Sequence, residues 1–159
     1  EFLSNNGCDL IILEMMYHPD RIRTVFEATK KTNKPIWAGF SVRRSGKGEV
    51  VSFTEEADIP FKEILDIVKD YDLDVVGIMH SAVEVISESV DILKNFYDGP
   101  IMAYPDSGGW VSPNWDFEKI IKPRDLHVMA QKWSSEGIKI IGGCCGLSPE
   151  HIEAIAKLR

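Results

Sequence analysis

Two adjacent cysteines are the strongest chemical signal in the sequence. Cys144 and Cys145 stand in Gly142-Gly143-Cys144-Cys145-Gly146, which ends an apolar run and precedes the helix-starting pair Ser148-Pro149. Flanking glycines allow backbone angles that turn two neighbouring thiols toward one centre. Thiolates suit zinc, and a catalytic zinc keeps three protein ligands and one open position. The pattern predicts a metal site that needs a third ligand from another strand. The alternative is that small residues merely pack where a strand meets a helix.

A histidine in a comparable position is the candidate for that third ligand. His80 ends the apolar run Gly77-Ile78-Met79-His80, so in a parallel sheet it lies at the same edge as the two cysteines. Neutral imidazole is a common zinc ligand, and a His/Cys/Cys set is chemically acceptable. We therefore predict that His80, Cys144 and Cys145 bind the metal. The alternative for His80 is a hydrogen-bonded loop residue.

Two carboxylates and a hydroxyl also stand near the ends of apolar runs. Glu14 interrupts the run over residues 10–16, where a carboxylate needs a partner or a solvated site. It is predicted to hold the ammonium group of a ligand; the alternative is an ion pair with a lysine or arginine of a neighbouring strand. Asp106 and Ser107 offer a carboxylate and a hydroxyl beside backbone amides, although Pro-Asp-Ser-Gly is also ordinary turn chemistry. We predict that all three bind substrate.

The elements that must position these residues alternate between strand and helix. Apolar runs of strand length occur near residues 9–15, 35–42, 74–80, 100–104 and 138–143. Their near-continuous hydrophobicity is typical of parallel strands covered on both faces, and segments of helical period separate them. The order predicts the α/β class, with right-handed crossovers. Because a (β/α)8 barrel takes eight strands, five give an open sheet or most of a barrel.

Two connections that follow strands are unusually long. Residues 43–59 and 105–121 are polar and contain glycine, and they belong at the carboxyl edge, where α/β active sites are built. His127 and His151 fall inside expected helices of the outer layer, so we expect both at the surface. The chain of 159 residues is expected to form one domain, residues 1–159.

Composition excludes several classes of partner. Lys and Arg number 18 against 25 Asp and Glu, for a net charge of −7, and the chain has no basic run, so nucleic acid is not an expected partner. No apolar stretch reaches the roughly 18 residues that a membrane span needs. Three cysteines, two of them adjacent, fit a reducing compartment better than a disulfide framework, so we expect a cytoplasmic protein.

With these motifs assembled, the sequence resembles the homocysteine S-methyltransferase domain family. The specific part is IGGCCGLSPEHI, residues 141–152, which is similar to the family's terminal zinc-binding motif. The resemblance covers essentially the whole chain and corresponds to roughly the last five strands of the family's TIM (β/α)8 barrel, an incomplete barrel. It implies that Cys144 and Cys145 bind Zn2+ and that Glu14 contacts the amino group of homocysteine.

The sequence departs from the family pattern in three respects. His80 stands where the family has a third cysteine, and Asp106 stands where it has an asparagine. With one neutral and two anionic ligands, zinc keeps no net charge, so a bound substrate thiolate is less electron-rich than with three thiolates. The family's first strands have no counterpart here. We therefore expect a homo-oligomer or a missing amino-terminal segment.

The resemblance implies a zinc-dependent methyltransferase. A methyl group would pass from a sulfonium, quaternary ammonium or cobalamin donor to the thiol of homocysteine or a related thiol, giving methionine. Three alternatives stay open: a non-catalytic or truncated metal-binding half-barrel, a vicinal-dithiol redox protein, and a metal-dependent aldolase or hydrolase with His80 and Asp106 as ligands.

Overall fold

Five parallel strands form the central sheet of the computed structural model, which describes residues 2–111 and 114–158. The strands are β1 (Ile11–Met16), β2 (Ile36–Phe40), β5 (Val75–Ala82), β6 (Ile101–Asp106) and β9 (Ile140–Ile141). They lie side by side in that order, and every pairing is parallel. A sequential order is the one that (β/α)8 barrels use, whereas doubly wound sheets reverse theirs. The predicted α/β class and its five strands are confirmed, and the sheet is open.

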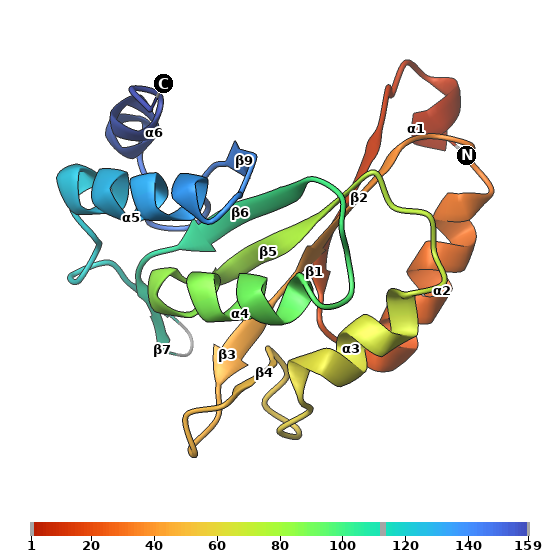
Figure 1. Ribbon diagram of the computed structural model, residues 1–159, viewed down its shortest axis with the longest axis horizontal. Coiled ribbons are helices and arrows are strands. Elements are labelled where there is room, and N and C mark those ends of the chain that lie inside the picture. Colours follow the sequence, from red (N-terminus) through yellow and green to blue (C-terminus); the bar gives the residue numbers. More distant parts are fainter. Residues whose placement is uncertain (1, 112–113, 159) are drawn as a thin grey trace.

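The helices cover one face of this sheet (Figure 1). They are α1 (Phe2–Asn5), α2 (Pro19–Lys30), α3 (Phe61–Val68), a 3-10 turn (Val83–Val85), α4 (Ile86–Leu93), α5 (Pro123–Ser135) and α6 (Pro149–Ile155). Alternate strand residues such as Ala38, Ile78 and Ala103 point toward the helices and join one large core with Phe26 and Trp133. None of the helices in the described part of the chain is long and apolar enough to cross a bilayer.

The opposite face of the sheet carries a second, smaller cluster. Val75, Met79 and Met102 are buried there, and Trp37, Tyr104 and Ile140 pack against them, partly exposed. Glycine makes this layer possible, because a side chain at Gly142 would overlap the ring of Tyr104 on the neighbouring strand β6. The Tyr104 ring therefore occupies the space where a side chain at residue 142 would lie, next to Cys144 and Cys145 in the sequence.

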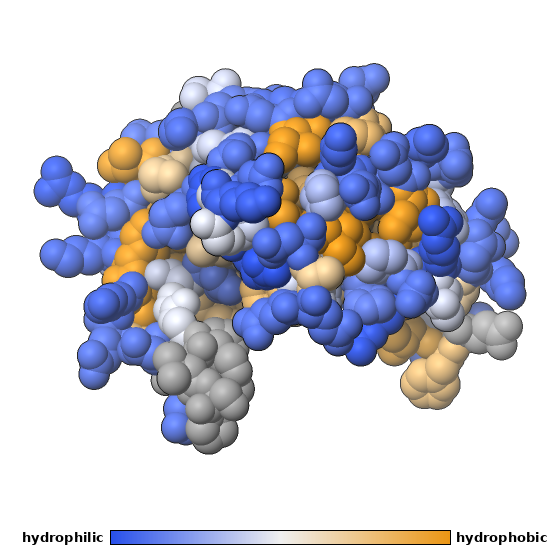
Figure 2. Space-filling model, turned by 90° about the horizontal axis from the view of Figure 1, so that it is seen from below, coloured by the Kyte–Doolittle hydropathy of each residue, from blue (hydrophilic) through white to orange (hydrophobic). Residues whose placement is uncertain are grey.

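Both long connections contain a β-hairpin that the sequence analysis did not predict. The first consists of β3 (Val42–Arg44) and β4 (Val50–Ser52), and the second of β7 (Gly109–Val111) and β8 (Asn114–Asp116). Both hairpins extend from the carboxyl edge of the sheet, as expected from their place after β2 and β6 (Figure 1). Viewed from that side, apolar side chains lie between hydrophilic ones in the middle of the face (Figure 2).

The last helix begins where its sequence predicts, at the N-cap Ser148 with Pro149 in the first turn. The expected surface position of His151 is wrong, because this side chain is buried. Its Nδ1 accepts a hydrogen bond from the Ser148 N–H at 3.0 Å, and its Nε2 donates to the Ile121 carbonyl at 2.6 Å. His127 is likewise half-buried, with Nδ1 donating to the Ala154 carbonyl at 2.7 Å. Both histidines hold elements together.

Candidate metal centre

The three residues predicted to bind metal meet at the carboxyl edge of the sheet. One ligand atom each from His80, Cys144 and Cys145 lies within 4.8 Å of the others. The sulfurs of Cys144 and Cys145 are 3.5 Å apart, and Cys144 Sγ lies 2.8 Å from His80 Nδ1. Tetrahedral zinc holds its S and N ligands roughly 3.3–3.8 Å apart, given bonds of about 2.0–2.3 Å. The sulfur pair has that spacing, and the Cys144–His80 contact is shorter, as expected for a hydrogen bond. The set therefore fits a soft divalent metal.

The cysteine loop is fixed to the end of the neighbouring strand. The Cys144 N–H donates to the Pro105 carbonyl at 2.8 Å, and the Ser107 N–H donates to the Cys145 carbonyl at 2.9 Å. Gly146 ends the loop with a φ of +78°, a conformation that favours glycine. These contacts direct the neighbouring sulfurs to the same place, which an extended strand could not do.

His80 is held in an unusual backbone conformation. Its φ is +47°, in an irregularity of β5 between Met79 and Ala82. A left-handed residue other than glycine costs about 1–2 kcal/mol and persists only where its surroundings fix it. The buried hydroxyl of Ser81 supplies this restraint, since it accepts from the Val42 N–H at 2.9 Å and donates to the Met79 carbonyl at 2.8 Å.

Glu14 reaches the same centre from β1. Its Oε2 lies 3.0 Å from Nε2 of His80, and about half of its side chain is exposed. Within the described residues no lysine or arginine pairs with Glu14, so the alternative of an ion pair with such a residue is not found. The contact with His80 was not predicted, because 66 residues separate the two and no motif links them.

Asp106 and Ser107 lie beside the centre with different partners. Burial raises the pKa of the Asp106 carboxyl, an effect that the nearby His80 opposes. The Ser107 hydroxyl accepts from the Ile121 N–H at 2.8 Å, so it holds the connection before α5 in place. Asp106 lines two cavities, one of about 630 Å³ and one of about 260 Å³, and Ser107 lines the smaller one.

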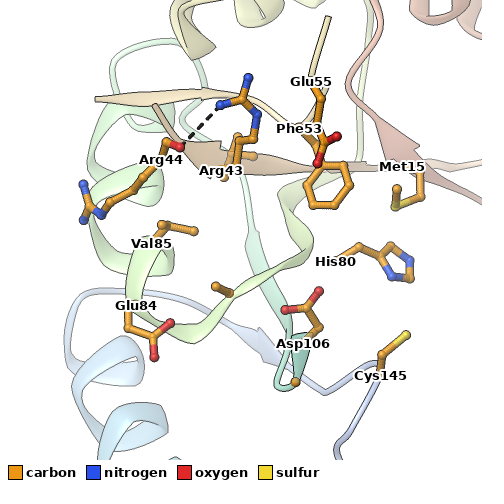
Figure 3. Close-up of a pocket in the computed structure, with 13 residues that line it drawn as sticks. Met15, Arg43, Arg44, Phe53, Glu55, His80, Glu84, Val85, Asp106 and Cys145 are labelled. Atoms are coloured by element: carbon orange, nitrogen blue, oxygen red, sulfur yellow. Dashed lines mark hydrogen bonds between the residues drawn. The ribbon is translucent and has the colours of Figure 1, made fainter. Parts of the chain in front are cut away.

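A cavity of about 630 Å³ opens next to the candidate ligands. His80, Asp106 and Cys145 line one side, and the first hairpin lines the other with Arg43 and Phe53 (Figure 3). Sequence analysis missed the hairpin residues. The signal that could have found them is the Gly-Lys-Gly turn at residues 46–48, with a valine at Val42 before it and the β-branched pair Val50-Val51 after it.

Two acidic groups at this centre have raised pKa values. Burial raises the pKa of the Cys144 thiol to about 12, and the hydrogen bond with Cys145 contributes to the shift. Burial also raises the pKa of the neighbouring Tyr104, with a further contribution from the Cys144 and Glu14 charges. A cation placed among these groups would offset the cost of forming thiolates.

Fold and site together define a class: an α/β protein of sequential parallel β/α units, with a His/Cys/Cys group of metal-ligand type at the carboxyl edge of its strands. The sequence profile of the homocysteine S-methyltransferase family matches residues 1–159. The chain belongs to this family.

Its relatives are longer proteins. The chain is 24% identical to a selenocysteine methyltransferase of Astragalus bisulcatus over 163 residues, which cover 99% of the chain and 46% of the relative. It is 30% identical to betaine–homocysteine S-methyltransferase 1 of Danio rerio over 171 residues, 98% of the chain and 41% of that protein. The chain thus spans less than half the length of these relatives.

A solved structure shows the same fold. The metallated form of the homocysteine methyltransferase MmuM from Escherichia coli superimposes with a TM-score of 0.72 at 24% sequence identity. The match covers 96% of this chain and 46% of that protein. The arrangement of strands and helices is therefore shared with a homocysteine methyltransferase.

Proposed function

We propose that the chain is the zinc-binding part of a methyltransferase that transfers a methyl group to the thiol of homocysteine, or of a related thiol, to give methionine. The observation that carries this proposal is the His80, Cys144 and Cys145 group, whose ligand atoms lie within 4.8 Å of one another in a member of this family. Relatives that act on homocysteine and selenocysteine support a thiol or selenol substrate.

His80, Cys144 and Cys145 are the residues that would hold the zinc ion. When bound, zinc would supply a Lewis acid that lowers the pKa of a substrate thiol. The chain's own residues then orient the reactants in the cavity of about 630 Å³, a size suited to small molecules. Holding two reactants in line supplies a large part of the catalysis of a displacement between them.

Polar groups around the cavity suit a charged substrate. Asp106 and Glu84 line it, and Glu14 lies at its edge against His80. In this proposal Glu14 and Asp106 bind the ammonium group of the amino acid, and Ser107 shapes the adjoining wall. Phe53, 37% exposed, offers an apolar surface to the methyl donor.

We also propose that residues 1–159 form one domain whose open sheet is completed by further strands, from a second copy or from an amino-terminal segment. The larger core cluster, which includes residues from Leu13 to Ile155, supports the first statement. Partly exposed Trp37 and Ile140 on the face without helices, and Ile12 at 44% exposure, support the second.

Metal content tests the proposed function. Inductively coupled plasma mass spectrometry on the full chain, purified without added metal, should find about one zinc per chain. The Cys144→Ser/Cys145→Ser double variant should lose it, whereas Cys8→Ser, the matched control in the third cysteine, should keep it. A folded wild type without zinc contradicts the proposal.

Methyl transfer is the second readout of the same test. The zinc-loaded chain is mixed with homocysteine and a sulfonium, quaternary ammonium or cobalamin donor, and methionine is measured. Methionine formed by the wild type and not by the double variant supports the proposal. Zinc bound without methionine from any donor leaves a metal-binding half-barrel instead.

A further inference from the structure

We propose that Glu14 is a positioning residue, which orients His80 so that Nδ1 of its ring faces the metal. This inference rests on the proposed zinc site and gives Glu14 a second role, in addition to binding the ammonium group of the substrate. It starts from one contact, the 3.0 Å between Glu14 Oε2 and His80 Nε2.

The two nitrogens of the His80 ring have different partners. A carboxylate only accepts hydrogen bonds, so Nε2 carries the proton and donates it to Glu14. Nδ1 then keeps its lone pair, and it lies 2.8 Å from Cys144 Sγ. The ligand atom of His80 is therefore Nδ1. A carboxylate on the other nitrogen fixes the ring and strengthens it as a ligand.

Unusual backbone conformations occur on both strands that supply this contact. Met15, which follows Glu14, has a φ of +56°, in an irregularity of β1 between Leu13 and Met16. His80 has a φ of +47° in the corresponding irregularity of β5. Strand β2 separates β1 from β5, so the two side chains meet across an intervening strand. Two strained residues at the ends of two strands, each costing about 1–3 kcal/mol, are typical of a functional arrangement.

The contact also adjusts the charge around the metal. Cys144 and Cys145 bring two negative charges as thiolates, and His80 brings none. The Glu14 carboxylate adds a third negative charge through the imidazole. The centre thereby gains charge without a fourth protein ligand, and the position for a substrate thiol stays open.

Zinc affinity and the His80 tautomer test the proposal on the full chain. Competition with a chelator should show about 10–100-fold weaker zinc binding in Glu14→Ala. Glu14→Gln still accepts from Nε2 but lacks the charge, so it should lose less affinity than Glu14→Ala. Glu63→Ala removes the same charge from an exposed position on α3 and should bind zinc like the wild type. Long-range 1H–15N spectra should show Nε2–H in wild type and Glu14→Gln, and a mixture of tautomers in metal-free Glu14→Ala.

Each outcome decides between the proposals. Wild-type affinity in Glu14→Ala, or an Nε2–H tautomer unchanged by that substitution, overturns the positioning role. Equal losses in Glu14→Gln and Glu14→Ala overturn it as well, since charge alone then explains the effect. A wild type that binds no zinc refutes the proposed function instead, because that result does not depend on Glu14.

Discussion

Removal of the Ser81 hydroxyl should destabilise the protein and weaken its metal site together. This hydroxyl is fully buried, accepts from the Val42 N–H and donates to the Met79 carbonyl. Ser81→Ala leaves the Val42 N–H without this acceptor, which costs about 1–3 kcal/mol, and loses a further bond worth about 0.5–1.5 kcal/mol. The free energy of unfolding should therefore fall by about 2–4 kcal/mol.

The same substitution should release the backbone of His80. Without the Ser81 hydroxyl the left-handed turn at His80 loses its restraint, so we expect zinc affinity to fall by about tenfold or more. Urea denaturation followed by circular dichroism measures the first effect, and chelator competition the second. Both use the full chain.

Ser89 provides a matched control for this prediction. Ser89 is equally buried, but its hydroxyl only donates, to the Val85 carbonyl at 2.6 Å. Ser89→Ala therefore leaves no buried N–H without an acceptor. We expect a loss of about 1 kcal/mol or less and unchanged zinc affinity. If Ser81→Ala costs no more than Ser89→Ala, or keeps wild-type zinc affinity, the restraint assigned to Ser81 is refuted.

Three further predictions concern the surroundings of the site. Gly142→Ala should overlap the Tyr104 ring and lower the free energy of unfolding by about 1–3 kcal/mol, measured by urea denaturation; full stability would contradict this close contact. His151→Ala should cost about 1–3 kcal/mol because the hydrogen bonds of both ring nitrogens are lost, and hydrogen exchange should rise in α6; unchanged exchange would contradict the role of His151 in holding this helix. Burial, and then Asp74, raise the pKa of Tyr97. The Tyr97 hydroxyl therefore loses its proton at lower pH in the unfolded chain than in the folded one, so the free energy of unfolding should fall as pH rises above about 10. Urea denaturation at several pH values should show a smaller fall in Tyr97→Phe. An equal fall in wild type and Tyr97→Phe would contradict this prediction.

Much of the fold follows from the order of apolar segments. Parallel strands covered on both faces need nearly continuous apolar residues, and the runs near residues 9–15, 74–80 and 100–104 show this pattern. The hairpin at residues 42–52 was missed because its strands are only three residues long. His151 was misplaced because the helical period does not show that its ring caps the helix and binds the connection before α5.

The candidate site was only partly visible in the sequence. Residue types and strand ends indicated His80, Cys144 and Cys145, because carboxyl ends of parallel strands meet at one edge. The contact between Glu14 and His80 depends instead on left-handed backbone at Met15 and His80. Histidine adopts this conformation more often than most residues, but it is uncommon for any residue except glycine, so residue type alone did not place it at these two positions.

The placement of the metal centre along the chain has a kinetic consequence. Cys144 meets His80 across 64 residues, and His80 meets Glu14 across 66, so the centre joins segments from both ends of the chain. We expect contacts of such long separation to form after the neighbouring strands β1, β2, β5 and β6 have paired, because closing the longer loops costs more entropy. A metal bound there would slow the unfolding rate while leaving the folding rate nearly unchanged. The centre would therefore add kinetic stability to a sheet that has already formed.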